Sequence, residues 1–170
     1  MLGIGGKELS EENAAQTAKA LNIIQPDFIR VHATGIKLES KLGEFVRDGS
    51  FTLQSEEEIV IEQKLFLQQL HEMDSYYVNE HIVNLLLEVR GNLRTEKQEM
   101  LSTIDRFLTL PPDERLLFTV GRRLNIFFRL DDLKNPKLHQ KAGESLQQIL
   151  SKNPHVDFGA LCNYVRQSQI

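Results

Sequence analysis

The spacing of apolar residues predicts alternating strands and helices in the first part of the chain. A helical stripe of Ala14, Ala18, Leu21 and Ile24 predicts a helix that follows a glycine turn, has Ser10 as its cap and stops at Pro26. Phe28 to Ala33 then alternates like a strand, with one face made of Ile29, Val31 and Ala33. With the apolar segment Met1-Leu2-Gly3-Ile4 as the first strand, strand, helix and second strand form a βαβ unit, which implies parallel pairing.

The same alternation continues to about residue 109. Ser55 and Glu58 form a predicted capping box for a helix whose inner face holds Ile59, Phe66, Leu70 and Met73. Tyr76 to Val78 is a strand candidate, followed by a loop through Gly91. Thr95 with Gln98 then predicts the start of a third helix carrying Leu101, Ile104 and Leu108.

Beyond Leu110-Pro111-Pro112 the pattern is helical throughout. Three amphipathic segments follow, with apolar positions from Leu116, from Leu138 and from Phe158. Each segment is too short to be stable alone, so we expect them to pack on the α/β part. The chain therefore divides into an α/β segment, 1–109, and a helical cap, 110–170.

Composition and charge exclude several classes of protein. The 170 residues carry a net charge of −4, which gives no field for indiscriminate binding to nucleic acid or anionic membranes. No apolar run approaches the length of about 20 residues that spans a bilayer. The single cysteine, Cys162, excludes an internal disulfide and any multi-cysteine metal site built from this chain alone. We expect a cytoplasmic protein in which Cys162 is a buried thiol.

The turn Gly3-Ile4-Gly5-Gly6 is the first candidate for chemistry. A glycine turn between a strand and a helix can aim backbone N–H groups at a phosphate or at an adenosyl group. The turn lacks the spacer of a phosphate loop, and Glu8 occupies the third glycine position of a dinucleotide fingerprint. From the motif alone, a plain tight turn is favoured.

Polar residues at predicted strand ends are the second candidate. His32 lies near the end of one strand, and Asn79, His81 and Asn84 follow the next. Ligands bind at this edge in α/β proteins, so these side chains are suited to line a site, although they are equally suited to anchor loops. The five histidines include no pair at the helical spacing of a zinc site.

Basic and aromatic residues mix between Gly121 and Arg129. RNA-binding proteins use such mixtures, but Phe127 and Phe128 fit a helical core stripe. Asp131 and Asp132 also offset the neighbouring Arg122 and Arg123. We therefore interpret this segment as structural, and no nucleic-acid partner is expected.

Taken together, these residues resemble a known family, the radical S-adenosylmethionine enzymes. Leu2 to Glu12 and Asn22 to Arg30 resemble a glycine turn, helix and strand in the second half of that family's barrel. Later similarities are Leu42, Val46, Gly49 and Phe51, and then His81, Asn84, Gly91 and Glu96-Lys97. The resemblance covers about residues 1–109 and names no substrate.

The resemblance implies a fold and a chemistry. The fold would be the last β/α units of a partial TIM-like barrel with parallel strands, followed by the helical extension. These enzymes use a 4Fe–4S cluster, held by a Cys-x-x-x-Cys-x-x-Cys loop, to cleave S-adenosylmethionine to a radical that abstracts hydrogen from the substrate. By this resemblance the adenosyl group would contact Gly3, Ile4, Gly5 and Gly6, and the substrate side of the pocket would hold His32, Asn79, His81 and Asn84.

The chain departs from the family at the cluster loop, which one cysteine cannot replace. We therefore expect a C-terminal fragment that binds neither metal nor cluster alone and is not catalytic by itself. Its expected partner is the N-terminal, cluster-binding part of the same barrel, and bare strand edges also favour self-association. The alternatives are a non-enzymatic helical interaction module and a small α/β nucleotide-binding domain.

Overall fold

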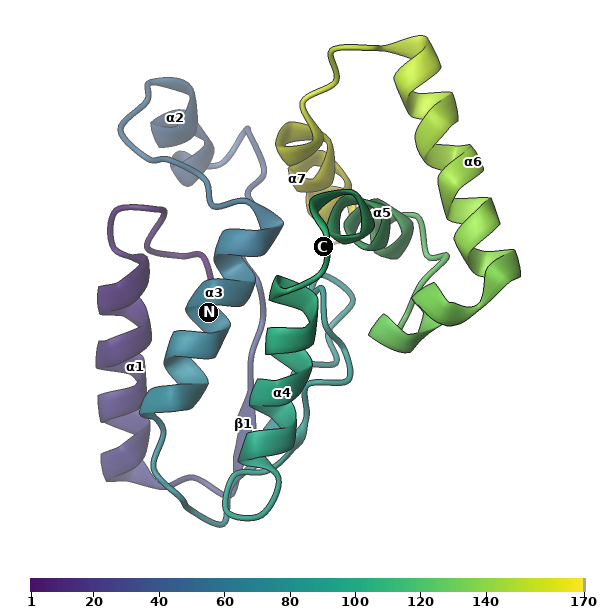
Figure 1. Cartoon of the computed structure of the whole chain (residues 1–170). Helices are drawn as coiled ribbons and strands as arrows, with labels where there is room; N and C mark the ends of the chain where they lie inside the picture. The colour runs from purple at the N-terminus through teal and green to yellow at the C-terminus, as the bar shows by residue number, and fades with distance from the viewer. Residues whose placement is uncertain (170) are drawn as a thin grey trace.

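The computed structural model describes residues 1–169 and shows a mixed α/β fold (Figure 1). The described residues form seven α-helices and a small three-stranded sheet. The helices are α1 (Ser10–Ile24), α2 (Lys41–Arg47), α3 (Glu56–Gln69), α4 (Lys97–Leu108), α5 (Pro112–Arg123), α6 (Pro136–Lys152) and α7 (Phe158–Ser168). The remaining elements are β1 (Phe28–Arg30), β2 (Tyr76–Val78), β3 (Gly91–Asn92) and the 3-10 helix η1 (Leu130–Lys134). The mixed α/β class predicted from the sequence is confirmed.

Three segments of the chain pair in parallel. β1 and β2 are parallel, with Ile29 opposite Tyr77. Leu2 adds an isolated parallel bridge to Ala33, and its backbone N–H donates to the His32 carbonyl at 2.8 Å. Leu2, β1 and β2 therefore lie side by side in chain order, as the predicted βαβ unit requires.

The sheet is not parallel throughout. β3 pairs antiparallel with β2, placing Gly91 opposite Tyr77, whereas the sequence interpretation treated the segment through Gly91 as a loop. Residues 79–90 form no helix. Because parallel strands need a long crossover, this short connection returns the chain in the antiparallel direction.

Helices α1 and α3 pack against each other and cover one face of the sheet. Tyr77 is buried on that face, where its hydroxyl accepts a hydrogen bond from Gln63 Nε2 at 3.0 Å. The opposite face exposes Phe28 and Tyr76, which are 55% and 42% accessible and stack with ring centroids 6.2 Å apart. The sheet thus has one covered face and one face with exposed aromatic rings.

The capping box predicted at the start of α3 is confirmed. Glu58 N–H donates to Ser55 Oγ at 3.2 Å, and Ser55 N–H donates to Glu58 Oε2 at 2.7 Å. Ile59 and Phe66 are buried on the inner face of this helix, as predicted, whereas Leu70 and Met73 are buried but lie beyond its end at Gln69.

Three details of the predicted helices are wrong. Ser10 does not cap α1, because it is the first residue of the helix and Leu9 occupies the cap position; its hydroxyl donates to Glu62 and accepts from Gln54 Nε2. Thr95 does not cap α4, which begins at Lys97 without a side-chain cap. Ile24, predicted to lie on the buried stripe of α1, is exposed at the last residue of that helix.

The C-terminal helices share a core with the α/β part. The ring of Phe118 in α5 lies 5.8 Å from that of Phe107 in α4 and 5.9 Å from that of Phe127. A Cβ at Gly121 would overlap the Phe127 ring, so glycine allows this contact. Phe128, predicted to be in the core, is exposed.

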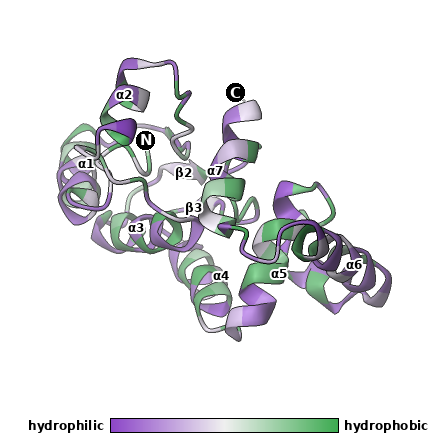
Figure 2. Ribbon diagram, turned by 90° about the horizontal axis from the view of Figure 1, so that it is seen from above, coloured by the Kyte–Doolittle hydropathy of each residue, from purple (hydrophilic) through white to green (hydrophobic). Residues whose placement is uncertain are grey.

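Helix α6 packs on α5 through Ala142 and turns a hydrophilic side outward (Figure 2). Among the helices of residues 1–169, none combines the length and apolar character needed to cross a membrane.

Candidate functional site at the carboxyl edge of the sheet

The parallel arrangement brings the candidate residues to one edge. The carboxyl ends of Leu2, β1 and β2 lead into the glycine turn, the His32 segment and the Asn79–Asn84 loop, respectively. This is the edge at which α/β proteins bind ligands. It is the upper edge in Figure 1, where α2 and α7 also lie.

The turn from Gly3 to Gly6 depends on its glycines. Gly3 and Gly6 have φ angles of 81° and 64°, which favour glycine, and Gly6 N–H donates to Gly3 O at 3.3 Å. A Cβ at Gly5 would stand 2.9 Å from the Leu9 carbonyl oxygen. Positions 3, 5 and 6 of the turn therefore favour glycine over any larger residue.

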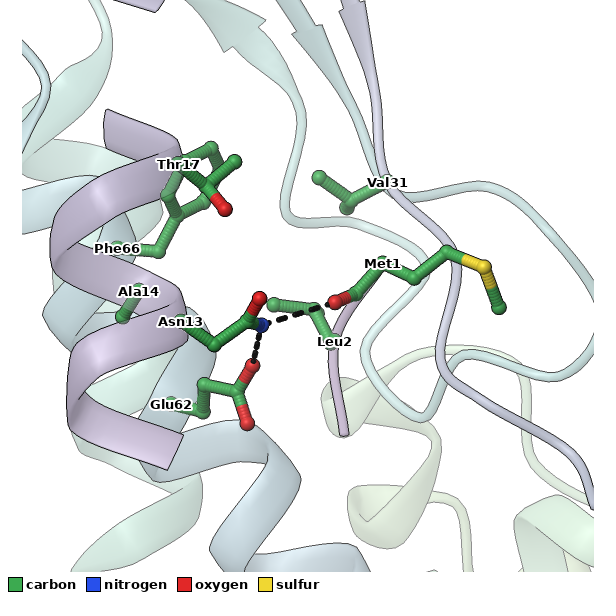
Figure 3. A pocket seen from close by; sticks show the side chains of 8 residues that line it. All are labelled: Met1, Leu2, Asn13, Ala14, Thr17, Val31, Glu62 and Phe66. Carbon is green, nitrogen blue, oxygen red and sulfur yellow. Dashed lines mark hydrogen bonds between the residues drawn. The ribbon is translucent and has the colours of Figure 1, made fainter. Parts of the chain in front are cut away.

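A buried carboxylate, that of Glu62 in α3, holds the turn in place, and Figure 3 shows its contact with Asn13 of α1. It accepts hydrogen bonds from Gly3 N–H at 3.2 Å, from Ser10 Oγ at 3.1 Å and from Asn13 Nδ2 at 2.6 Å. Asn13 also donates to the Met1 carbonyl at 3.0 Å. A negative charge beside the N-terminus of α1 is favoured by the helix dipole.

Sequence reasoning missed Glu62, although a signal was present. The residue lies three positions after Ile59 and four before Phe66, so it belongs to the buried face of α3. An acidic residue on a buried stripe must find hydrogen-bond donors. Only the fold shows that the glycine turn supplies them.

Glu62 limits what the turn can bind. The N–H groups of Gly3 and Gly6 are used within the chain, whereas those of Ile4 and Gly5 have no acceptor among residues 1–169. A phosphate placed here would meet the Glu62 charge, and like charges repel strongly where water is scarce. A neutral or cationic nucleoside meets no such repulsion.

The structure brings His32 and His81 together. Their ring centroids are 4.1 Å apart, with the planes inclined by 33°. His81 Nδ1 accepts a hydrogen bond from Val83 N–H at 3.4 Å, so in the neutral ring the proton is on Nε2. Burial lowers the pKa of His32 below its ordinary value, and the neighbouring His81 and Arg30 lower it further.

Asn84 and Asn79 are fully buried and bind the backbone. Asn84 Oδ1 accepts from Ala33 N–H at 2.7 Å, while its Nδ2 donates to the Val31 carbonyl at 2.9 Å. Asn79 Nδ2 donates to the Leu86 carbonyl at 2.7 Å, and its Oδ1 has no partner among the described residues. Asn84 therefore fastens the loop to the strand, whereas Asn79 keeps one buried acceptor free.

Two buried arginines of α5 donate hydrogen bonds to the backbone of the Asn79–Asn84 loop. Arg122 Nη2 donates to the carbonyls of Ile82 and Asn84, at 2.9 and 3.2 Å, and Arg123 Nη2 donates to that of Val83 at 2.9 Å. Three consecutive carbonyl groups thus bond to one helix. The sequence interpretation, in which nearby aspartates offset these arginines, missed their burial.

A groove opens beside the glycine turn, between the α2 segment and α7. Its volume is about 670 Å³, within the range of about 300–1,000 Å³ common for ligand pockets. Lys7 lies at its glycine-turn end and pairs with Glu58 at 2.8 Å. Phe51 and Tyr164 are among the larger side chains along it.

The chain's donor set does not fit a 4Fe–4S cluster held by three thiolates. Cys162 is the single cysteine of the sequence and is buried in α7. Burial raises the pKa of its thiol to about 12, and the nearby Glu56 carboxylate acts in the same direction. Within residues 1–169 no group of three or more His, Cys, Asp or Glu side chains is placed to hold a metal ion.

Comparison with protein-family models, with curated proteins and with solved structures gives no match to this chain.

Proposed function

We propose that this chain forms the last β/α units of a radical S-adenosylmethionine barrel and supplies its adenosyl-contacting turn and part of its substrate pocket. The observation that carries the proposal is the order Leu2, β1, β2 with α1 and α3 on one face. In a β/α barrel, consecutive strands are neighbours and every connecting helix lies outside. Doubly wound sheets place their helices on both faces.

The uncovered face of the sheet supports the same proposal. β1 and β2 pair in parallel, and parallel strands are normally covered on both faces, yet Phe28 and Tyr76 are exposed on the face opposite α1 and α3. In a barrel that face points inward, toward the strands on the other side. The partner we propose is the remaining, cluster-bearing part of the barrel.

The chemistry divides between the two parts. Cysteines outside this chain would hold the cluster, which would supply the electron for cleavage of S-adenosylmethionine. In our proposal the open N–H groups of Ile4 and Gly5 contact the adenosyl group, and Glu62 fixes the turn. His32 and His81 line the substrate side, with Asn84 and the α5 arginines positioning their loop. The chain alone is not catalytic.

Glu62 separates this proposal from a nucleotide-binding domain. Its buried carboxylate occupies the N–H of Gly3 and places a negative charge beside the turn, where it would repel a phosphate. The adenosyl group is neutral, and the sulfonium of S-adenosylmethionine is positive. The turn therefore favours S-adenosylmethionine over ATP.

Calorimetry on the 170-residue chain tests the proposal. S-adenosylmethionine and 5′-deoxyadenosine should bind at up to millimolar concentrations, with ATP at least about tenfold weaker because of the repulsion from Glu62. Binding should be lost in Gly5→Ala, whose methyl group meets the Leu9 carbonyl, and kept in Gly143→Ala, whose methyl group meets open space. Tighter binding of ATP or a nicotinamide nucleotide would favour the nucleotide-binding domain. An absence of binding at millimolar concentrations would contradict both.

A further inference from the structure

The loop 37–51, which contains α2, stands above the carboxyl edge of the sheet (Figure 1). Among the described residues, each hydrogen bond and ion pair of this loop joins two of its own residues, such as Phe51 N–H to the Phe45 carbonyl at 3.0 Å. Gly43 is its one buried residue, and a Cβ there would meet the Leu38 carbonyl of the same loop. The loop therefore holds its own shape and is tied to the rest of the fold at its ends.

Both ends of the loop are attached beside the candidate site. Ile36, just before the loop, is buried in the segment that follows β1. Just after the loop, the Thr52 carbonyl accepts a hydrogen bond from Lys7 N–H at 3.0 Å. A Cβ at Gly6 would lie 3.2 Å from the Phe51 ring, so the last residue of the loop rests on the glycine turn. A ligand at the turn would meet this attachment.

The contacts of the loop favour its movement as a unit. Segments with few buried apolar side chains separate from the body of a fold at a low cost in free energy. Gly49, near the C-terminal end of the loop, has a φ angle of 80°, and a Cβ there would meet nothing within 4 Å. The hinges of lids are a few loop positions of this kind. The structure thus gives the loop a hinge close to its attachment at Thr52.

The groove of about 670 Å³ beside the glycine turn lies between this loop and α7. Leu38 and Val46 line it from the loop, and Ala160 and Tyr164 line it from α7. Leu38 and Tyr164 are 43% and 69% accessible, so each wall of the groove carries an exposed side chain with a large apolar surface. Bringing such surfaces together removes them from water and is favourable.

We propose that the loop 37–51 is a lid that closes across the groove onto α7 and covers the glycine turn when the turn holds its ligand. Closure buries Leu38 against Tyr164 and excludes water from the turn, as lids do in many enzymes. The movement of the loop does not depend on the function proposed for the turn, whereas its response to a ligand rests on that function.

A disulfide across the groove tests closure in the free chain. Leu38→Cys and Tyr164→Cys are introduced together, and mass spectrometry under a glutathione redox buffer identifies which thiols are joined. The groove separates these two positions, and a disulfide needs Cα atoms within about 7 Å, so the bond reports closure. It should form at least about tenfold faster than in the matched control Glu39→Cys with Tyr164→Cys, whose first thiol does not line the groove. Equal rates in the two pairs would overturn the lid.

Amide hydrogen exchange of the unchanged chain tests the response to a ligand. Without ligand, the amides of the loop should exchange faster than those of α3. With 5′-deoxyadenosine at ten times its dissociation constant, exchange in the loop should slow by up to about tenfold. Slower exchange at the turn but not in the loop would overturn the lid and leave the function of the turn standing. An absence of binding at millimolar concentrations would contradict that function, and the disulfide experiment alone would then decide whether the loop closes.

Discussion

The carboxylate of Glu62 lies 3.2 Å from the backbone nitrogen of Gly3, although the two residues are 59 positions apart in the sequence. This contact joins α3 to the turn that precedes α1. It fixes the turn, occupies one of its N–H groups and gives the turn a negative charge. The proposed preference for an adenosyl group over a phosphate follows from it.

Replacing Glu62 should destabilise the fold. Glu62→Ala leaves the donors of Gly3, Ser10 and Asn13 without their acceptor, and we expect a loss of about 2–4 kcal/mol in the free energy of unfolding. Urea denaturation measures it. The control Glu72→Ala removes an exposed carboxylate and should change stability by less than about 0.5 kcal/mol. Equal stability of the two variants would contradict the role given to Glu62.

Breaking the buried ion pair of Glu56 should cost more. Burial raises the pKa of this carboxyl, but Arg123 and Arg166 outweigh that effect and hold it below its ordinary value. Glu56→Gln leaves both guanidinium groups buried without a counter-charge, and we expect a loss of about 3–5 kcal/mol. The control Asp131→Asn, at an exposed ion pair, should have little effect in the same denaturation experiment.

The sign of the pH dependence at Glu56 follows from its lowered pKa. The stabilisation that the ionised Glu56 carboxylate provides is complete above the pKa of this group in the unfolded chain. It disappears as pH falls through the lower pKa of Glu56 in the folded state. Glu56→Gln should therefore flatten the acid side of the stability curve. An unchanged slope below pH about 4 would show that the pair contributes nothing there.

His32 should titrate below its ordinary range. Its pKa is lowered chiefly by burial and then by His81 and Arg30, so the unfolded chain binds a proton more readily than the folded one. Stability should be independent of this group above pH about 6.5 and should decrease as pH falls below it. NMR titration of the His32 ring gives the value directly, and His81→Ala should raise it. If His32 titrated at the pH of a histidine in a model peptide, its contact with His81 would be contradicted.

Replacing each of two helical glycines with alanine should change the stability of the fold in opposite directions. A methyl group at Gly121 overlaps the Phe127 ring, so Gly121→Ala should cost about 1–3 kcal/mol. Gly143 faces open space in α6, and Gly143→Ala should stabilise by about 0.5–1 kcal/mol through helix propensity. Thermal unfolding of both variants compares them. A stabilised Gly121→Ala would mean that α5 and Phe127 are not in contact.

Local patterns in the sequence predicted local structure well. The alternation of Ile29 and Val31 gave the buried face of the first strand, and the Ser55–Glu58 capping box gave the start of α3. These signals depend on residues a few positions apart. The expected cap at Ser10 was wrong because the helix begins at Ser10 itself, whose hydroxyl bonds to Glu62 and Gln54, far along the chain.

Long-range contacts account for what the sequence did not predict. The ion pair of Arg123 with Glu56 joins residues 67 positions apart, so no pattern of neighbouring residues in the sequence predicts it. Phe128 was assigned to the core by spacing, but the helix ends before it and the side chain turns outward over Arg122. His32 and His81 were both predicted at strand ends, and parallel pairing brought their rings together.

Backbone amide NMR of the labelled chain during titration with 5′-deoxyadenosine tests the central claim most directly. Our account predicts saturable shifts centred on the amides of Ile4 and Gly5, extending to Gly3 and Gly6, and little response there to ATP. Shifts confined to residues away from the carboxyl edge, or a turn that responds to ATP and not to 5′-deoxyadenosine, would contradict it.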